Sequence, residues 1–223
     1  MTPVSNENLV RLNTALYSRF MKYNITLQVI NSAVSITGER RNAESVISYM
    51  RMINEAQTVE AMMGRDLPIR RLDMRCHPVI ELRLNEAGLA LELIVAPDAW
   101  CDQQNLNGKL SIERHRQTFR QMIARLDDNY RLGFGQDMSL DAMHLKPFQA
   151  AHPAVFEKWI TTFGDGQDWF RIGVWYDTLP ENLLDMKDEL FRQAQVLYDF
   201  YTFIAWTGNN NFRAFQQRQL AYA

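Results

Sequence analysis

Two glutamates on a predicted β-hairpin are the residues of this sequence whose type and spacing best suit catalysis. Apolar and polar residues alternate over 72–84 and again over 89–95. A strict period of two predicts two strands, each with one apolar and one polar face. If the two runs pair as an antiparallel hairpin around Gly88, Glu81 lies opposite Glu92 on the polar face.

Opposed carboxylates repel each other, so such a pair needs a bridging metal ion, a retained proton or neighbouring cations. His77 shares the polar face and could bind a divalent ion or move protons. One hypothesis is therefore a metal-dependent hydrolase that acts on phosphodiesters, with Glu81, Glu92 and His77 as catalytic residues. The alternative, which we favour, is a solvated ladder in which Arg75 and Arg83 offset both acids.

No motif in the chain names a reaction. The GxSxG elbow, the Walker phosphate loop, the GxGxxG fingerprint and the HExxH zinc motif are all absent from the sequence. We therefore predict no cofactor and no metal-ligand set, and we favour a protein that is not an enzyme over one that is.

Four arginines flank a predicted helix over about 40–63 and are candidates for binding an anion. Arg40 and Arg41 open the helix, where free backbone N–H groups favour negative charge, and Arg70 and Arg71 follow its end. They support nucleic-acid binding as a further alternative, although the net charge of −2 argues against a protein whose whole surface binds nucleic acid.

The first 63 residues predict a helix over 5–22, a short hairpin over 25–36 and then the 40–63 helix. This order resembles the αββα layout of KH-like RNA-binding folds. The resemblance covers the layout only, because Gly38 and the three residues after it lack the second glycine of the GxxG loop.

The last third of the chain is unusually aromatic. Fifteen of the 25 aromatic residues lie between Phe156 and Phe215. A long helix predicted over about 181–206 is apolar on nearly every side, which indicates burial on two sides or contact with a partner. The candidate contacts to a protein partner or a second copy of the chain are Trp175, Phe200, Phe203 and Trp206.

The remaining patterns complete an α+β prediction: an antiparallel sheet with helices packed mainly on one face and a long C-terminal helix. The further predicted segments are a loop over 97–110, helices over 111–127 and 153–163, and strands over 130–134 and 170–176. We expect one compact domain over 1–223, with 1–128 and 129–223 as a possible subdivision.

Cys76 and Cys101 are isolated from each other and form no disulfide framework, which is typical of a reducing compartment. No run of 18 apolar residues occurs. We therefore expect a soluble, cytoplasmic protein that does not enter a membrane. The function predicted from the whole sequence is that of a non-catalytic binding or interaction protein, which could be a subunit of a larger assembly.

Overall fold

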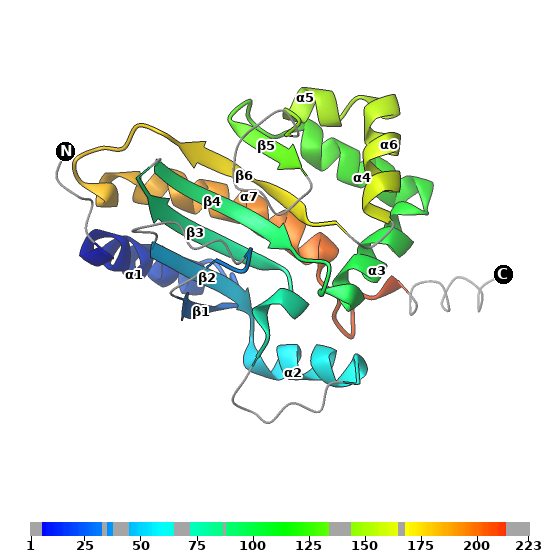
Figure 1. Cartoon of the computed structure of the whole chain (residues 1–223), viewed down its shortest axis with the longest axis horizontal. Coiled ribbons are helices and arrows are strands. Elements are labelled where there is room, and N and C mark those ends of the chain that lie inside the picture. Colours follow the sequence, from blue (N-terminus) through cyan, green and yellow to red (C-terminus); the bar gives the residue numbers. More distant parts are fainter. Residues whose placement is uncertain are drawn as a thin grey trace.

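A six-stranded antiparallel sheet organises the computed structural model (Figure 1). The structure describes residues 6–32, 35–37, 45–64, 72–86, 88–133, 144–164 and 168–212. In spatial order the strands are β1 (Leu27–Ser32), β2 (Ser45–Arg51), β3 (Val79–Asn85), β4 (Gly88–Val95), β6 (Phe170–Tyr176) and β5 (Tyr130–Gly133). Because β6 inserts between β4 and β5, one sheet joins strands from both sides of residue 129.

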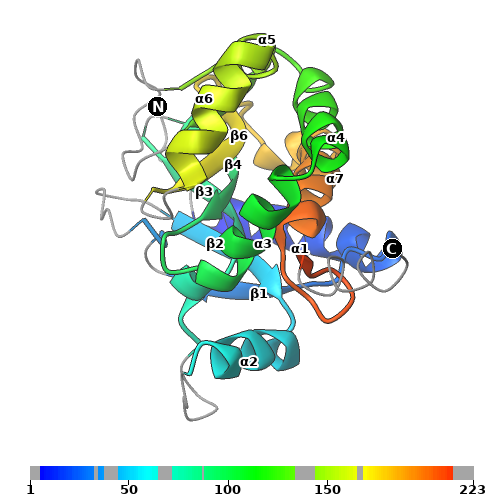
Figure 2. The same cartoon turned by 90° about the vertical axis from the view of Figure 1, so that its right-hand side faces the viewer.

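Two long helices pack side by side against one face of this sheet (Figures 1 and 2). They are α1 (Asn6–Lys22) and α7 (Lys187–Ile204). The other helices are α2 (Ile53–Met62), α3 (Trp100–Leu110), α4 (Glu113–Ala124), α5 (Pro147–Ala150) and α6 (Pro153–Gly164), with 3-10 turns at Met74–Cys76 and Leu183–Met186. The predicted α+β class is confirmed. None of the helices in the described segments is long and apolar enough to cross a bilayer.

The main core lies between the helices and one face of the sheet, and it contains much of the aromatic third of the chain. Phe119 of α4 is fully buried at its centre. Its ring centroid lies between 5.1 and 6.5 Å from those of Phe156, Trp159, Phe170, Phe200 and Phe203. Burial of large side chains is therefore the main role of these aromatic residues.

The opposite face of the sheet is also buried. A second apolar cluster on that face contains Ile36, Met50, Ala56, Val79, Ile94, Ala96 and Trp169. Burial on both faces hides the alternation that marks a strand, because polar side chains are no longer needed on one side.

That burial explains the largest error in the sequence prediction. Residues 45–51 form β2, in which every residue from Val46 onward is buried. Within the described part of the predicted 40–63 helix, residues 45–63, only Ile53–Met62 is helical. β1 consequently pairs with β2 and not with residues 34–36. Ile36 lies in a turn, and Val34 lies outside the described residues.

The predicted loop over 97–110 is also wrong, because α3 occupies Trp100–Leu110. Asn105, Asn107 and Gly108 have low helix propensity, so tertiary contacts must stabilise this helix. Gly108 packs against Phe212, whose ring would lie 2.3 Å from a Cβ at that position. The predicted strand from residue 72 begins later, at Val79.

Candidate functional site

The predicted register of the two glutamates is confirmed. Glu81 of β3 is the register partner of Glu92 of β4, and Gly173 of β6 follows Glu92 in the same row. A Cβ at Gly173 would lie 2.6 Å from Cγ of Glu92. The missing side chain at Gly173 therefore leaves room for the Glu92 carboxylate above the sheet.

Arginines neutralise Glu92 inside the protein. Nη2 of Arg171 donates to both carboxylate oxygens of Glu92, at 2.7 and 2.8 Å, and Arg83 forms a second ion pair with the same carboxylate. All three side chains are at most 1% exposed. The prediction of a solvated ladder is therefore wrong, because these side chains are buried. The second arginine that neutralises Glu92 is Arg171 and not Arg75. Arg75 instead pairs with Asp98 at 3.0 Å.

Glu81 is satisfied mainly by uncharged donors. Its carboxylate accepts from Oγ of Ser35 at 2.6 Å, from the backbone N–H of Ile36 at 2.9 Å and from Oγ of Ser48 at 3.3 Å. Nε of Arg83 lies 3.9 Å away. Hydrogen bonds of this kind stabilise an ionised carboxylate without a metal.

His77 does not join the two glutamates. Its Nε2 lies 3.1 Å from Oε1 of Glu60 on α2, and both side chains are buried. Within the described residues, no group of three His, Cys, Asp or Glu side chains could hold a metal ion. His77 therefore pairs with Glu60 and not with the two glutamates of the hydrolase hypothesis.

The other predicted site residues are scattered. Arg40, Arg41, Arg70 and Arg71 all lie outside the described residues. Phe200 is 1% exposed and belongs to the core, which leaves no part of it for a partner. Trp175 and Phe203 are half-buried. The ring of Trp175 makes an edge contact with the ring of His144, and the ring of Phe203 packs against that of Phe119. Trp206, also half-buried, lines a pocket.

This pocket, called the α3 pocket below, lies beside α3 and the chain segment that follows α7. Its volume is about 270 Å³. The lining residues are Met62, Trp100, Cys101, Gln104, Asn105, Gly108, Trp206 and Phe212. Three aromatic rings and a methionine supply its apolar surface, whereas the amides of Gln104 and Asn105 supply polar groups. Concave, mostly apolar sites with a few polar groups are the usual form of a binding site.

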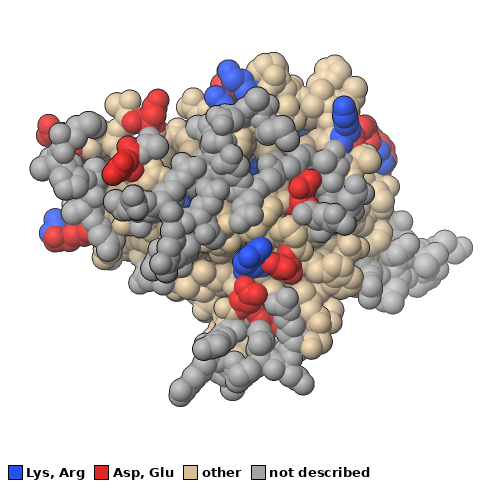
Figure 3. Space-filling view, in the orientation of Figure 1, with Lys and Arg blue, Asp and Glu red and all other residues tan. Residues whose placement is uncertain are grey.

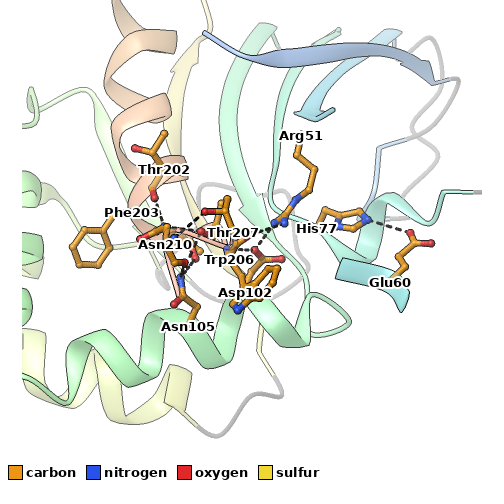
Figure 4. A network of polar contacts seen from close by, with 12 residues as sticks. Arg51, Glu60, His77, Asp102, Asn105, Thr202, Phe203, Trp206, Thr207 and Asn210 are labelled. Atoms are coloured by element: carbon orange, nitrogen blue, oxygen red, sulfur yellow. Dashed lines mark hydrogen bonds and ion pairs between the residues drawn. The ribbon is translucent and has the colours of Figure 1, made fainter. Parts of the chain in front are cut away.

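A buried ion pair fixes the backbone of Trp206 (Figure 4). Arg51, at the end of β2, is paired with Asp102 of α3, and the two side chains are 2% and 0% exposed. Oδ1 of Asp102 accepts the backbone N–H of Trp206 at 2.6 Å, and Nη1 of Arg51 donates to the Trp206 carbonyl at 2.8 Å. The pair therefore holds both backbone polar groups of one residue that lines the pocket.

Asn105 fixes the rest of the same segment. Its Nδ2 donates to the carbonyls of Ile204 at 3.0 Å and Asn210 at 3.2 Å, while its Oδ1 accepts the N–H of Phe212 at 2.8 Å. The two side chains Asp102 and Asn105, one turn apart on α3, thus position the aromatic residues Trp206 and Phe212 on one side of the α3 pocket.

The electrostatics of the ion pair reflect its depth. Burial raises the pKa of the Asp102 carboxyl, while the Arg51 guanidinium and the Trp206 N–H oppose that rise. Arg51 donates to the Trp206 carbonyl and Asp102 accepts the Trp206 N–H, which offsets part of the cost of removing two charges from water.

Sequence reasoning missed this arrangement, apart from Trp206. Arg51, Asp102 and Trp206 are separated by 50 or more positions, and none of them belongs to a motif. The one available signal was Trp100, a large apolar residue in a predicted loop, which is 51% exposed.

No protein-family model matches the chain, and a search of curated proteins finds no similar sequence. The geometry of the pocket and of the residues that hold its walls is therefore what points to a function.

Proposed function

We propose that this protein is a non-catalytic binding protein whose α3 pocket receives an aromatic or large aliphatic side chain of a protein partner. The observation that carries the proposal is the use of a buried ion pair, Arg51–Asp102, to fix Trp206 at the wall of an apolar pocket. A binding site needs walls that are already in place before the ligand arrives, because ordering them on binding would cost affinity.

The size of the pocket supports a side chain as its occupant. Its volume of about 270 Å³ is below the roughly 300–1,000 Å³ of pockets that enclose drug-sized ligands. An aromatic residue that inserts into a desolvated pocket is the usual anchor of a protein interface.

The surroundings of the pocket favour a protein partner over an isolated small molecule. Met62 and Trp100 are 53% and 51% exposed, and both also line a second hollow that is shared with Met63, Pro97 and Asp98. Met52 and Ile53, at the start of α2, are exposed by 46% and 38%. Methionine and tryptophan are enriched in protein interfaces, where several apolar contacts surround a central anchor.

The two alternatives receive less support. A hydrolase at Glu81 and Glu92 would use carboxylates whose oxygens already accept several hydrogen bonds or ion pairs. Nucleic-acid binding would depend on arginines outside the described residues. On the face in Figure 3, the described basic side chains are scattered and often lie beside acidic ones, which provides little local positive field.

The test uses two compounds that imitate partner side chains, N-acetyl-phenylalaninamide and N-acetyl-leucinamide. Titration of the full chain should change the intrinsic tryptophan fluorescence and saturate with a dissociation constant of about 1 mM, the weak affinity expected of a ligand with few atoms. Absence of saturable change for both compounds would contradict the proposal.

A blocking variant provides the matched control. Gln104 is exposed at the pocket, so Gln104→Trp should fill it without disturbing the core and should abolish the titration. Gln117→Trp adds the same side chain to an exposed position of α4, away from the pocket, and should leave the dissociation constant unchanged. Equal binding by both variants would place the compounds elsewhere.

A further inference from the structure

Lys109 of α3 is a buried amine that has only uncharged partners. Its side chain is 8% exposed. Nζ donates to the carbonyl of Phe203 at 2.6 Å and to Oδ1 of Asn210 at 2.5 Å, and it lies 4.8 Å from the centroid of the Phe203 ring. Among the described residues, no carboxylate lies within ion-pair distance of Nζ.

Burial makes the ammonium form of this amine less favourable than it is in water. An ammonium has three N–H groups, whereas the site offers two acceptors. A neutral amine satisfies both acceptors with its two hydrogens and keeps a lone pair for reaction. Burial accordingly lowers the pKa of Lys109 to about 8.

The amine lines a groove of about 450 Å³ that is different from the α3 pocket. The groove is lined by Lys109, His115, Met122, Asp199, Thr202, Phe203 and Asn210. It contains a ring face, a methionine side chain and several hydrogen-bonding groups, so a small organic molecule could lie beside Nζ.

We propose that Lys109 is a carbonyl-reactive amine that captures a small aldehyde in this groove. The lone pair of Nζ forms a bond to the carbonyl carbon, and the C=O π electrons move to the oxygen. A proton passes from nitrogen to oxygen through water in the groove, which gives a carbinolamine. Loss of water then leaves an imine, so that amine and aldehyde yield imine and one water molecule.

Two other titratable groups face Lys109 from neighbouring helices. On α4, burial lowers the pKa of His115, helped by the positive charges of Lys109 and Arg114. On α7, burial raises the pKa of Asp199. A neutral imidazole that lines the same groove can assist this transfer by taking the proton from nitrogen and passing it on to the oxygen. A group of perturbed titratable residues around one groove is typical of a reactive site.

The experiment compares Lys109 with the other four lysines of the wild-type chain. The full-length protein is incubated at pH 8 with benzaldehyde and sodium cyanoborohydride, which reduces each imine to a stable amine, and modified peptides are quantified by mass spectrometry. An ordinary lysine with a pKa near 10.4 is only ~0.4% neutral at this pH. We therefore expect Lys109 to be labelled about tenfold faster than Lys22, Lys146, Lys158 or Lys187, after allowance for its lower nucleophilicity. Labelling of Lys109 at or below their rate would overturn the proposal.

A variant pair separates reactivity from mere access to the groove. Asn210→Asp places a carboxylate beside Nζ, which should hold the amine protonated and slow its labelling about tenfold. Asn209→Asp puts the same charge on the exposed neighbouring residue and should slow labelling less than twofold. Equal labelling of Lys109 in the two variants, with thermal unfolding showing both folded, would also contradict the proposal.

Discussion

At the scale of single residues, the buried Arg51–Asp102 pair is a point where one substitution should cost much stability. Asp102→Ala would leave a buried guanidinium without its anion and the Trp206 N–H without its acceptor. We expect it to lower the free energy of unfolding by about 3–5 kcal/mol in urea denaturation. Arg11→Ala, which removes an exposed pair with Glu7, should cost less than about 1 kcal/mol.

The double variant Arg51→Met, Asp102→Leu provides a further check on this residue-scale account. Removing both charges leaves no unpaired ion, so its cost should be smaller than that of Asp102→Ala alone. A cost below about 1 kcal/mol for Asp102→Ala would instead mean that the pair does not hold the segment.

Lys109 makes stability depend on pH in a predictable direction. Its pKa in the folded protein is about 8, below the ~10.4 expected in the unfolded chain. Between those values the unfolded chain binds more protons, so the free energy of unfolding should rise with pH. The stability of wild type relative to Lys109→Met should therefore increase between pH 7 and pH 10 in urea denaturation. A difference independent of pH would show that the amine titrates normally.

At the scale of elements, the end of α7 is held by side chains of α3 and of the segment beyond α7. The side chain of Asn105 donates to the carbonyl of Ile204, and that of Lys109 donates to the carbonyl of Phe203. The side chain of Asn210 donates to the carbonyls of Thr202 and Ala205. These carbonyls at the end of the helix therefore each accept a hydrogen bond. A helix leaves its last four carbonyls without partners inside the helix. The contact between α3 and α7 therefore ends the long helix and shapes the pocket at the same time.

Asn105→Ala tests that coupling. The substitution removes the donor to two carbonyls and the acceptor for the Phe212 N–H. We expect the free energy of unfolding to fall by about 1–3 kcal/mol and proteolysis after residue 204 to become faster. Gln104→Ala, on the same helix but exposed, should leave both the unfolding curve and the proteolysis rate nearly unchanged. Similar effects from the two variants would argue against a specific role for Asn105.

The buried charged residues around Glu81 and Glu92 give the second prediction at the scale of elements. Glu92→Gln would leave two buried arginines without their anion and should lower the free energy of unfolding by about 3–5 kcal/mol. Glu81→Gln, which weakens hydrogen bonds to uncharged donors, should lower it by about 1–3 kcal/mol. The exposed Glu157→Gln is the control and should change the free energy of unfolding by less than about 1 kcal/mol. If Glu81→Gln raised stability, repulsion within the carboxylate pair would be stronger than the hydrogen bonds to Glu81.

Local patterns predicted the elements whose apolar residues all lie on one face. The β3–β4 hairpin, including its register at Glu81 and Glu92, follows from strict alternation, and α1 follows from its 3–4 spacing. The sequence predicts a helix where β2 lies, because apolar residues occupy both faces of that strand. It predicts a loop where α3 lies, because long-range contacts override the low helix propensity of that segment. The α3 pocket depends on those same contacts, so only Trp206 among its walls could be selected from the sequence.

At the scale of the whole molecule, one end of the fold differs from the rest. Both faces of the sheet are buried. The main core covers one face, and the other face carries the glutamate–arginine ion pairs beside a small apolar cluster. Among the described residues, eight large apolar side chains are exposed, and four of them, Met52, Ile53, Met62 and Trp100, lie on or beside α2 and α3, at the lower side of the view in Figure 1. The other four lie on α1, just after it and on α5. What sets the α2–α3 end apart is that its exposed residues Met62 and Trp100 line two adjoining hollows. The central claim is that this end binds a partner's side chain in a pocket that is already formed.

The most direct measurement is the indole N–H spectrum of the ¹⁵N-labelled protein, titrated with N-acetyl-phenylalaninamide. The chain has five tryptophans, of which Trp100 and Trp206 line the pocket while Trp159 and Trp169 are buried. The account predicts saturable shifts of the Trp100 and Trp206 signals, with the signals of Trp159 and Trp169 unmoved. If Trp100 and Trp206 did not shift up to about 10 mM, a concentration roughly ten times the expected dissociation constant, the α3 pocket would not be the binding site.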